Sequence, residues 1–141
     1  MPKTAIAPEL LTAYLTTRYT VQATPPFVVM AGQANPELNR WMARHCCHSA
    51  AYITACNPYS QPLDDTANAV RQRQLVQWIE ARGLPYAQGT GESSDGSWKP
   101  EPSYLVGGVS LQDAQTLGQQ LAQNALIWCE ENAFARLILL R

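Results

Sequence analysis

Eight polar residues of this sequence have the types and spacing that could form a binding site. They stand where predicted strands end or predicted helices begin, and they are Asn57, Ser60, Asn68, Arg71, Glu101, Ser103, Gln123 and Asn124. The run "AAYITAC" is apolar and stops abruptly at Asn57-Pro58. Amides and hydroxyls provide hydrogen bonds, and Arg71 provides a positive charge. The set therefore predicts a site for a polar or anionic small molecule.

The N-terminus of the longest predicted helix is where an anion would bind most favourably. That helix begins after Asp64 or Asp65, either of which could cap it, and it ends at Gly83. The first backbone N–H groups of a helix have no partner within the helix, and the helix dipole favours negative charge there. We therefore expect the ligand at this end of the helix.

Each of these residues also has a structural interpretation. Asn57 and Asn68 could cap or brace turns, and Ser103 could satisfy the edge of a strand. Arg71 and Glu101 could form a structural ion pair with each other. For a single residue the structural role is favoured, and it is the expected convergence of the set that supports a pocket.

Catalysis has less support in the sequence than binding. Glu101 is the one acid that we nominate as a general base if there is chemistry, and no nucleophile or metal accompanies it. Cys56 could be a nucleophile at a strand end, but a small apolar cysteine packed under the loop is the favoured interpretation. Whether the protein is an enzyme stays open, and we expect no cofactor.

Three other motifs are weak. The run His45-Cys46-Cys47-His48 holds the only two histidines, but its spacing is not that of a zinc site and no second ligand pair exists. The segment "GTGESSDGS" lacks the Gly-Lys-Ser/Thr ending of a phosphate-binding loop. Trp98 could cover the core or act as a lid, and we favour the cover. No metal site is therefore predicted.

The periodicity of apolar residues predicts the elements that must position these groups. They are a helix over 8–17, strands at 18–23 and 26–32, a helix over 37–45, a buried strand at 50–55, the long helix ending at Gly83, strands at 84–88 and 103–109 around a loop over 89–102, a helix over 111–122 and a hairpin over 125–140 that turns near Glu131-Asn132. This order predicts an α/β (α+β) fold, a single domain over 1–141 in which about four helices pack on a mixed sheet of about six to seven strands.

Strand directions predict that the polar residues meet. A helical crossover generally makes neighbouring strands parallel, and a short connection makes them antiparallel. If the strands ending at 55 and 88 run the same way, the loops that follow them leave the same end of the sheet. The helix over 111–122 then returns Gln123 and Asn124 to that end.

Composition narrows the classes of function. The 141 residues are 46% apolar and 15% charged, with a net charge of −1 and no dense basic cluster, so sequence-independent nucleic-acid binding is unlikely. No segment has the length of a membrane span, and the first residues do not resemble a signal peptide. We expect a cytoplasmic protein whose four cysteines are free thiols.

Several of these motifs together resemble a known family. They are I-T-A-C-N-P at 53–58, Ser60, Asn68, Arg71, Trp98, Glu101-Pro102-Ser103 and Gln123-Asn124-Ala125. The sequence from about Ala13 to Leu140 is similar to a bacterial family known as domain of unknown function 3293. The resemblance implies a small stand-alone cytoplasmic protein and no particular reaction. Members often have an aromatic residue before Asn-Pro, and Cys56 at that position argues against a thiol mechanism.

A second class of function stays open beside ligand binding. In this alternative the protein is an interaction or regulatory module without catalytic activity, and an apolar surface carries the function. Exposed Trp or Tyr side chains, or a dimer in solution, would favour it. The sequence does not indicate which protein such a partner would be.

Overall fold

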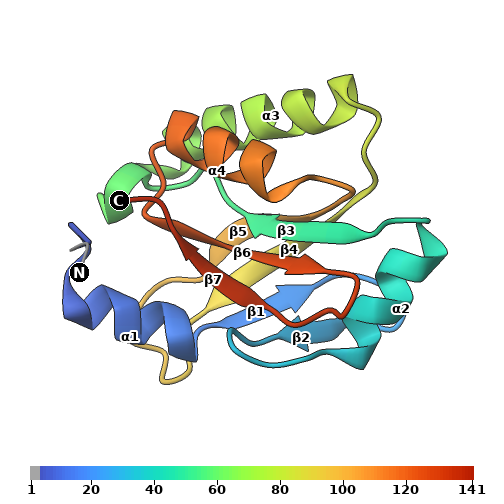
Figure 1. Cartoon of the computed structure of the whole chain (residues 1–141). Coiled ribbons are helices and arrows are strands. Elements are labelled where there is room, and N and C mark those ends of the chain that lie inside the picture. Colours follow the sequence, from blue (N-terminus) through green and yellow to red (C-terminus); the bar gives the residue numbers. More distant parts are fainter. Residues whose placement is uncertain (1–3) are drawn as a thin grey trace.

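Seven strands pair into one curled sheet in the computed structural model, which describes residues 4–141 (Figure 1). The strands are β1 (Arg18–Val21), β2 (Phe27–Val29), β3 (Ser49–Ile53), β4 (Tyr86–Glu92), β5 (Glu101–Gly107), β6 (Ala125–Glu130) and β7 (Arg136–Leu139). Their order across the sheet is β2-β1-β4-β5-β3-β6-β7. With the four α-helices of the described chain packed against this sheet, the α+β fold class is confirmed.

The pairing of the strands differs from the mixed sheet that was expected, because every pair is antiparallel. The strands β3 and β4, joined by a helical crossover, do run in the same direction, but β5 lies between them and is antiparallel to both. The strand β5 therefore takes the position that a parallel neighbour would have occupied. The loops after β3 and β4 nevertheless leave the same end of the sheet.

Three of the four α-helices in the described chain begin after a residue whose side chain caps them, and the first begins with Pro8 after Ala7, which has no capping side chain. The helices are α1 (Pro8–Thr16), α2 (Pro36–Arg44), α3 (Asp65–Ala81) and α4 (Leu111–Gln120), with a short 3₁₀ turn at Pro58–Ser60. Asn35, Asp64 and Ser110 each accept a hydrogen bond from the backbone N–H three residues later. No helix in the described part of the chain combines the length and the apolar character needed to cross a membrane.

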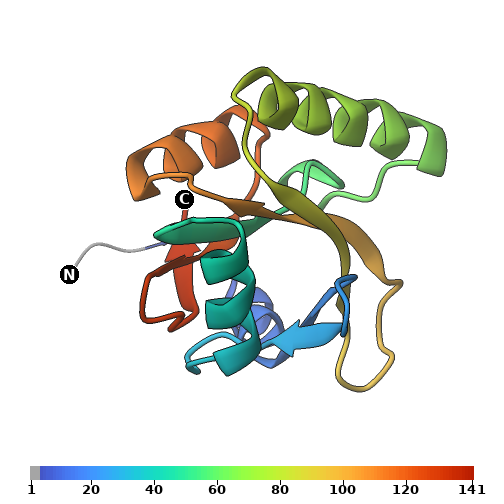
Figure 2. The ribbon, with the colours of Figure 1, turned by 90° about the vertical axis from the view of Figure 1, so that its right-hand side faces the viewer.

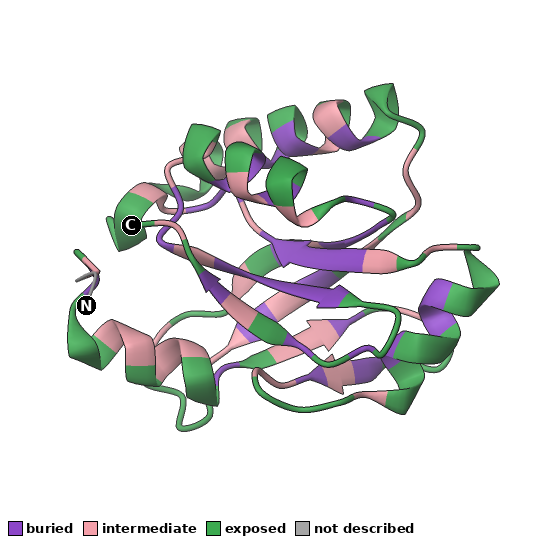
Figure 3. Cartoon of the chain, in the orientation of Figure 1, coloured by how far each residue is buried: buried purple, intermediate pink, exposed green. Residues whose placement is uncertain are grey.

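The helices cover both faces of the sheet, as Figures 1 and 2 show. The helices α3 and α4 lie on one face, and α1 and α2 lie on the other. Side chains of the central strand β3 alternate between the two: Ala51 and Ile53 join the core under α3 and α4, whereas Ala50 and Tyr52 join the core on the α1/α2 face. Burial is consequently concentrated along the strands (Figure 3).

The hairpin of β4 and β5 is longer than the sequence indicated. A loop was expected over 89–102, but β4 continues to Glu92 and β5 begins at Glu101, which leaves 93–100 as the connection. Glycine is uncommon in strands, so Gly89 and Gly91 suggested a loop. At Gly89 the reason for glycine is space, because a Cβ there would lie 2.1 Å from the carbonyl oxygen of Thr20.

Candidate functional site

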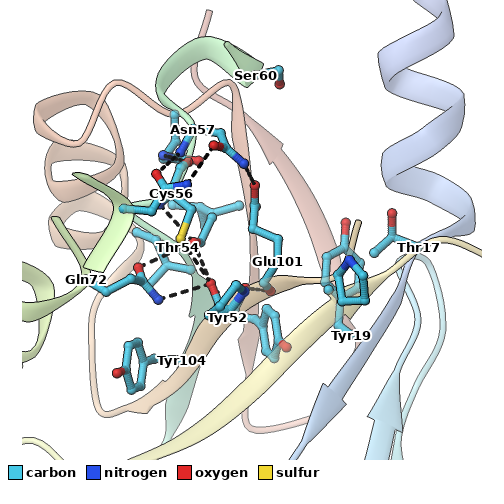
Figure 4. Close-up of a pocket in the computed structure, with 18 of the residues that line it drawn as sticks. Thr17, Tyr19, Tyr52, Thr54, Cys56, Asn57, Ser60, Gln72, Glu101 and Tyr104 are labelled. Carbon is cyan, nitrogen blue, oxygen red and sulfur yellow. Dashed lines mark hydrogen bonds between the residues drawn. The ribbon is translucent and has the colours of Figure 1, made fainter. Parts of the chain in front are cut away.

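A cavity of about 1070 Å³ opens at the end of the sheet where the polar residues were expected to meet (Figure 4). Its walls come from α1, from strands on the α1/α2 face, from the N-terminal part of α3 and from the segment 98–104. Six of the eight predicted residues line it: Asn57, Ser60, Asn68, Glu101, Ser103 and Gln123. Arg71 and Asn124 do not, although Asn124 donates hydrogen bonds to Tyr14 and Ser60, which do.

Asn57 is the centre of the hydrogen-bond network. Its backbone has φ of 49°, a left-handed conformation that asparagine tolerates better than most residues. Its N–H donates to Oδ1 of Asn68 at 2.9 Å, and its own Oδ1 accepts from Nδ2 of Asn68 at 2.9 Å and from the N–H of Leu63 at 3.0 Å. Its Nδ2 donates to Oε2 of Glu101 at 2.9 Å. The bracing role of Asn57 and Asn68 thus also fixes the position of Glu101.

Arg71 holds backbone groups together. Its Nε donates to the carbonyl oxygen of Ala55 at 2.5 Å, and its Nη2 donates to the carbonyl oxygen of Leu121. It therefore joins the end of β3 to the end of α4. The guanidinium forms no salt bridge with Glu101, and it does not line the cavity.

Two glutamines satisfy the backbone where the chain leaves β3. Gln72 accepts a hydrogen bond from the N–H of Ala55 at 2.7 Å and donates to the carbonyl oxygen of Pro102 at 3.0 Å. Gln123 donates to the carbonyl oxygen of Cys56 at 3.0 Å. Buried backbone groups without partners are costly, so these side chains stabilise an irregular segment inside the fold.

The N-terminus of α3 is occupied by acidic side chains of the protein. Asp64 accepts a hydrogen bond from the N–H of Ala67 at 2.7 Å. Asp65 pairs with Lys99 at 2.9 Å on the exposed rim of the cavity. The helix end and Arg71, the two features that predicted an anionic ligand, are therefore engaged with protein groups.

A second network lies at the edge of the cavity. The hydroxyls of Ser60 and Tyr14 are 3.1 Å apart, and Nδ2 of Asn124 donates to both, at 3.0 and 3.2 Å. Arg141 donates to Oδ1 of Asn124 at 3.1 Å, and its guanidinium lies 4.3 Å from the centre of the Tyr59 ring. This network joins α1 and the last residue of the chain to the Asn57 loop.

Glu101 is a partly buried carboxylate at the first position of β5, on the same face as Ser103 and Leu105. Burial raises its pKa, and the hydrogen bond from Asn57 lowers it to a smaller extent. In Figure 4 its side chain extends toward Asn57, with Thr17 and Tyr19 on the opposite wall. The residue thus combines a fixed position with a pKa closer to neutral than usual.

Glu101→Gln is expected to stabilise the folded chain more at neutral pH than at acidic pH. The folded chain keeps the Glu101 proton to a higher pH than the unfolded chain, where the pKa is near its ordinary value of 4.5. The residue therefore favours folding below pH 4.5, and this contribution is lost as the pH rises through the folded pKa. Glutamine keeps an oxygen for Asn57 and does not titrate. The melting temperatures of both proteins between pH 4 and 8 test this, and a difference that does not grow with pH contradicts it.

The sequence did not indicate the aromatic wall of the cavity. Tyr19 and Tyr52 lie edge to face at 5.2 Å between ring centres, and their hydroxyls donate to the carbonyl oxygens of Tyr14 and Thr20. Burial raises the pKa of both tyrosines. Aromatic residues in strands usually indicate a hydrophobic core. The strand order β1-β4-β5-β3, in which Tyr19 of β1 and Tyr52 of β3 contact each other, has no local signal in the sequence. Thr17, a buried polar residue, was missed for the same reason.

The remaining motifs have structural surroundings. The His45–His48 run follows the end of α2, and His48 pairs at the surface with Glu131. Among residues 4–141, no group of three or more His, Cys, Asp or Glu side chains is placed to hold a metal ion. All four cysteines are free thiols. Cys56 is buried and its pKa is raised by burial, which supports the packing interpretation. Trp98 lines the cavity.

Comparison with known proteins gives one match. Residues 53–126 match the family described as protein of unknown function (DUF3293), and this segment contains every motif on which the resemblance rested. No curated protein and no solved structure matches the chain. The helix α1, the strand β1 and Thr17 between them lie outside the matched segment, and they supply Tyr14, Thr17 and Tyr19 to the cavity.

Proposed function

Because the chain belongs to the family of unknown function DUF3293, whose description names no activity, we propose a function from the cavity: the protein binds a polar small molecule there. Asn57, Ser60, Asn68, Glu101 and Ser103 are its polar contacts in this proposal. Of the other predicted residues, Gln123 supports the wall, and Arg71 and Asn124 hold the loops in place. The site is the cavity beside the α3 N-terminus rather than the helix end itself.

The cavity is the observation that carries this proposal. Its volume of about 1070 Å³ is at the upper end for small-molecule sites, which are usually apolar with a few polar groups that fix orientation. Apolar and aromatic side chains such as Leu10, Tyr19 and Ile127 line this space together with the carboxylate of Glu101. Glu101 is also the group placed to accept a proton if the bound molecule reacts.

Gly91 provides a way to fill the cavity. It lies on the cavity wall in β4, and a Cβ built there meets nothing closer than the Thr17 methyl at 3.8 Å. Valine is well suited to a strand, so Gly91→Val is expected to fold and to occupy ligand volume. Thr90→Val is the matched control, because Thr90 is the preceding residue of β4 and does not line the cavity.

A thermal-shift screen with polar metabolites tests the proposal. We expect at least one compound class to raise the melting temperature saturably in the natural protein and in Thr90→Val, because a ligand of the native state stabilises it by mass action. The shift should be lost in Gly91→Val. A shift that persists in Gly91→Val would place the ligand elsewhere, and no shift in any class would contradict ligand binding.

Exposed tyrosines favour the second candidate function, a protein-interaction module. Tyr59 and Tyr86 are 44% and 37% exposed, and they belong to separate segments of the chain, as do the exposed Leu15 and Leu139. An interface would have to gather such residues into one patch. Molecular mass from light scattering over a concentration series tests this, and a mass that stays at one chain contradicts self-association.

A further inference from the structure

The charge of the ligand can be inferred from the donor and acceptor groups of the cavity that form no hydrogen bond within the protein. This step rests on the proposed function, because it concerns the occupant of the same cavity. The side-chain amides near the cavity already donate to protein oxygens. Asn57 donates to Glu101, Asn68 to Asn57, and Gln72 and Gln123 to backbone carbonyls. These amides therefore offer a ligand few free donors, and the two basic residues that line the cavity, Arg73 and Lys99, are exposed.

In contrast to the amide donors, the main acceptor in the cavity wall has a free atom. Glu101 accepts one hydrogen bond from the described residues, at Oε2 from Asn57, which leaves Oε1 for a ligand. The hydroxyls of Tyr19 and Tyr52 donate to backbone carbonyls, so these residues present their rings and not their protons. A ligand that fits this wall must bring its own donors.

No basic side chain of residues 4–141 neutralises Glu101. The salt bridges in that part of the chain involve Glu37, Glu131 and Asp65. Arg71, the predicted charge partner, donates to two carbonyl oxygens. Of the two basic residues that line the cavity, Lys99 pairs with Asp65, and Arg73 forms no salt bridge with Glu101. A partly buried carboxylate without a cation is an unfavourable arrangement, and the direction of its pKa change agrees with this. A positively charged ligand would remove that cost.

We propose that the cavity binds an organic molecule through a protonated amine, with the ammonium group at Oε1 of Glu101 and the apolar part against Tyr19 and Tyr52. An ammonium carries three donors and no acceptor, which matches an acceptor-rich wall. Aromatic faces also attract cations, so the Tyr19–Tyr52 pair suits a carbon skeleton that carries one. A carboxylate or phosphate ligand would meet the negative charge of Glu101.

Matched probe compounds test whether the cavity prefers a positively charged ligand. 2-Phenylethylamine, 2-phenylethanol and 3-phenylpropanoate share one skeleton and differ in charge, and n-butylamine, n-butanol and pentanoate repeat the comparison without the ring. Binding is measured by calorimetry and by thermal shift at pH 7.5. We expect the amines to bind and the alcohols and carboxylates to bind at least about tenfold more weakly. We also expect amine affinity to fall at acidic pH, as Glu101 takes up a proton.

Two variants locate the ammonium group. Glu101→Gln keeps the shape of the side chain and the contact with Asn57, and it should weaken amine binding at least about tenfold. Glu92→Gln removes an acid of the adjacent strand that does not line the cavity, and binding should be unchanged. Circular dichroism confirms that both variants are folded.

The outcomes separate this inference from the proposed function. Tighter binding of the alcohols or carboxylates, lost in Gly91→Val and unchanged in Glu101→Gln, would overturn the amine proposal and keep the cavity as a binding site. Amine binding that is equal in Glu101→Gln and in the natural protein would overturn the role of Glu101. No binding by probes or metabolites of any class would overturn both proposals.

Discussion

Gly89→Ala is expected to lower the free energy of unfolding by about 3 kcal/mol, because the strand has no room for one methyl group. A Cβ at this position would lie 2.1 Å from the carbonyl oxygen of Thr20 and 2.6 Å from the hydroxyl of Tyr52. Both atoms are fixed, since that hydroxyl donates to that same carbonyl at 2.7 Å. The methyl group would push β4 away from β1 or force Tyr52 out of the core. Chemical denaturation of both proteins measures the loss.

Gly91→Ala is the matched control for this prediction. Gly91 lies two residues further along β4 on the same face, and a Cβ there has its nearest contact at 3.8 Å. Alanine also restricts the unfolded chain, so the change should be close to neutral or slightly stabilising. Equal losses at the two positions would contradict this prediction, because they would show that the space under Tyr52 is not what requires glycine at position 89.

Arg71→Ala is expected to destabilise the fold by about 3 kcal/mol, because it removes two charge-assisted hydrogen bonds to backbone carbonyls. The acceptors belong to Ala55, which is fully buried, and to Leu121. Without the guanidinium, the end of β3 and the end of α4 lose their connection, and the carbonyl of Ala55 loses a donor. The midpoint and slope of urea unfolding provide the measurement.

Arg73→Ala is the control, because Arg73 is an exposed residue on the same helix. A surface change of this kind should stay within about 0.5 kcal/mol. Binding of any ligand found in the cavity should be retained by the fraction of Arg71→Ala that is folded. An Arg71→Ala protein of natural stability that no longer responds to ligand would restore Arg71 as the charge partner of an anion.

Local chemistry made much of the fold predictable. Asp64, one of the two caps expected for the long helix, does cap it, and the hairpin at the C-terminal end turns near Glu131 as expected. Caps and turns depend on a few neighbouring residues, so the sequence contains their signal. The position of β5 between β3 and β4 depends on the whole sheet, so the sequence did not show that every pair of neighbouring strands would be antiparallel.

The candidate site shows the same division. The sequence identified the polar residues that gather at the end of the sheet, because they follow strand ends or helix ends. It could not show which hydrogen-bond partner each of these residues would have. Arg71 donates to backbone carbonyls, whereas Glu101 accepts from an amide. A shift of about one residue between segments far apart in the chain would change either partner, and the sequence does not define their relative position that closely. The aromatic wall formed by Tyr19 and Tyr52 depends on strand pairing and had no local signal.

The strand order also has a consequence for the order of events during protein synthesis. The strand β3 is central and apolar, and its partners are β5 and β6, which both follow it in the chain beyond the long helix α3. When β3 leaves the ribosome, neither partner has been translated. Its backbone groups and the side chains of Ala50–Ile53 therefore remain without their sheet partners until α3, β4 and then β5 have been made. Distant pairing of this kind slows folding and exposes the nascent chain to aggregation, so production of the protein should depend on slow translation or on chaperones more than its size suggests.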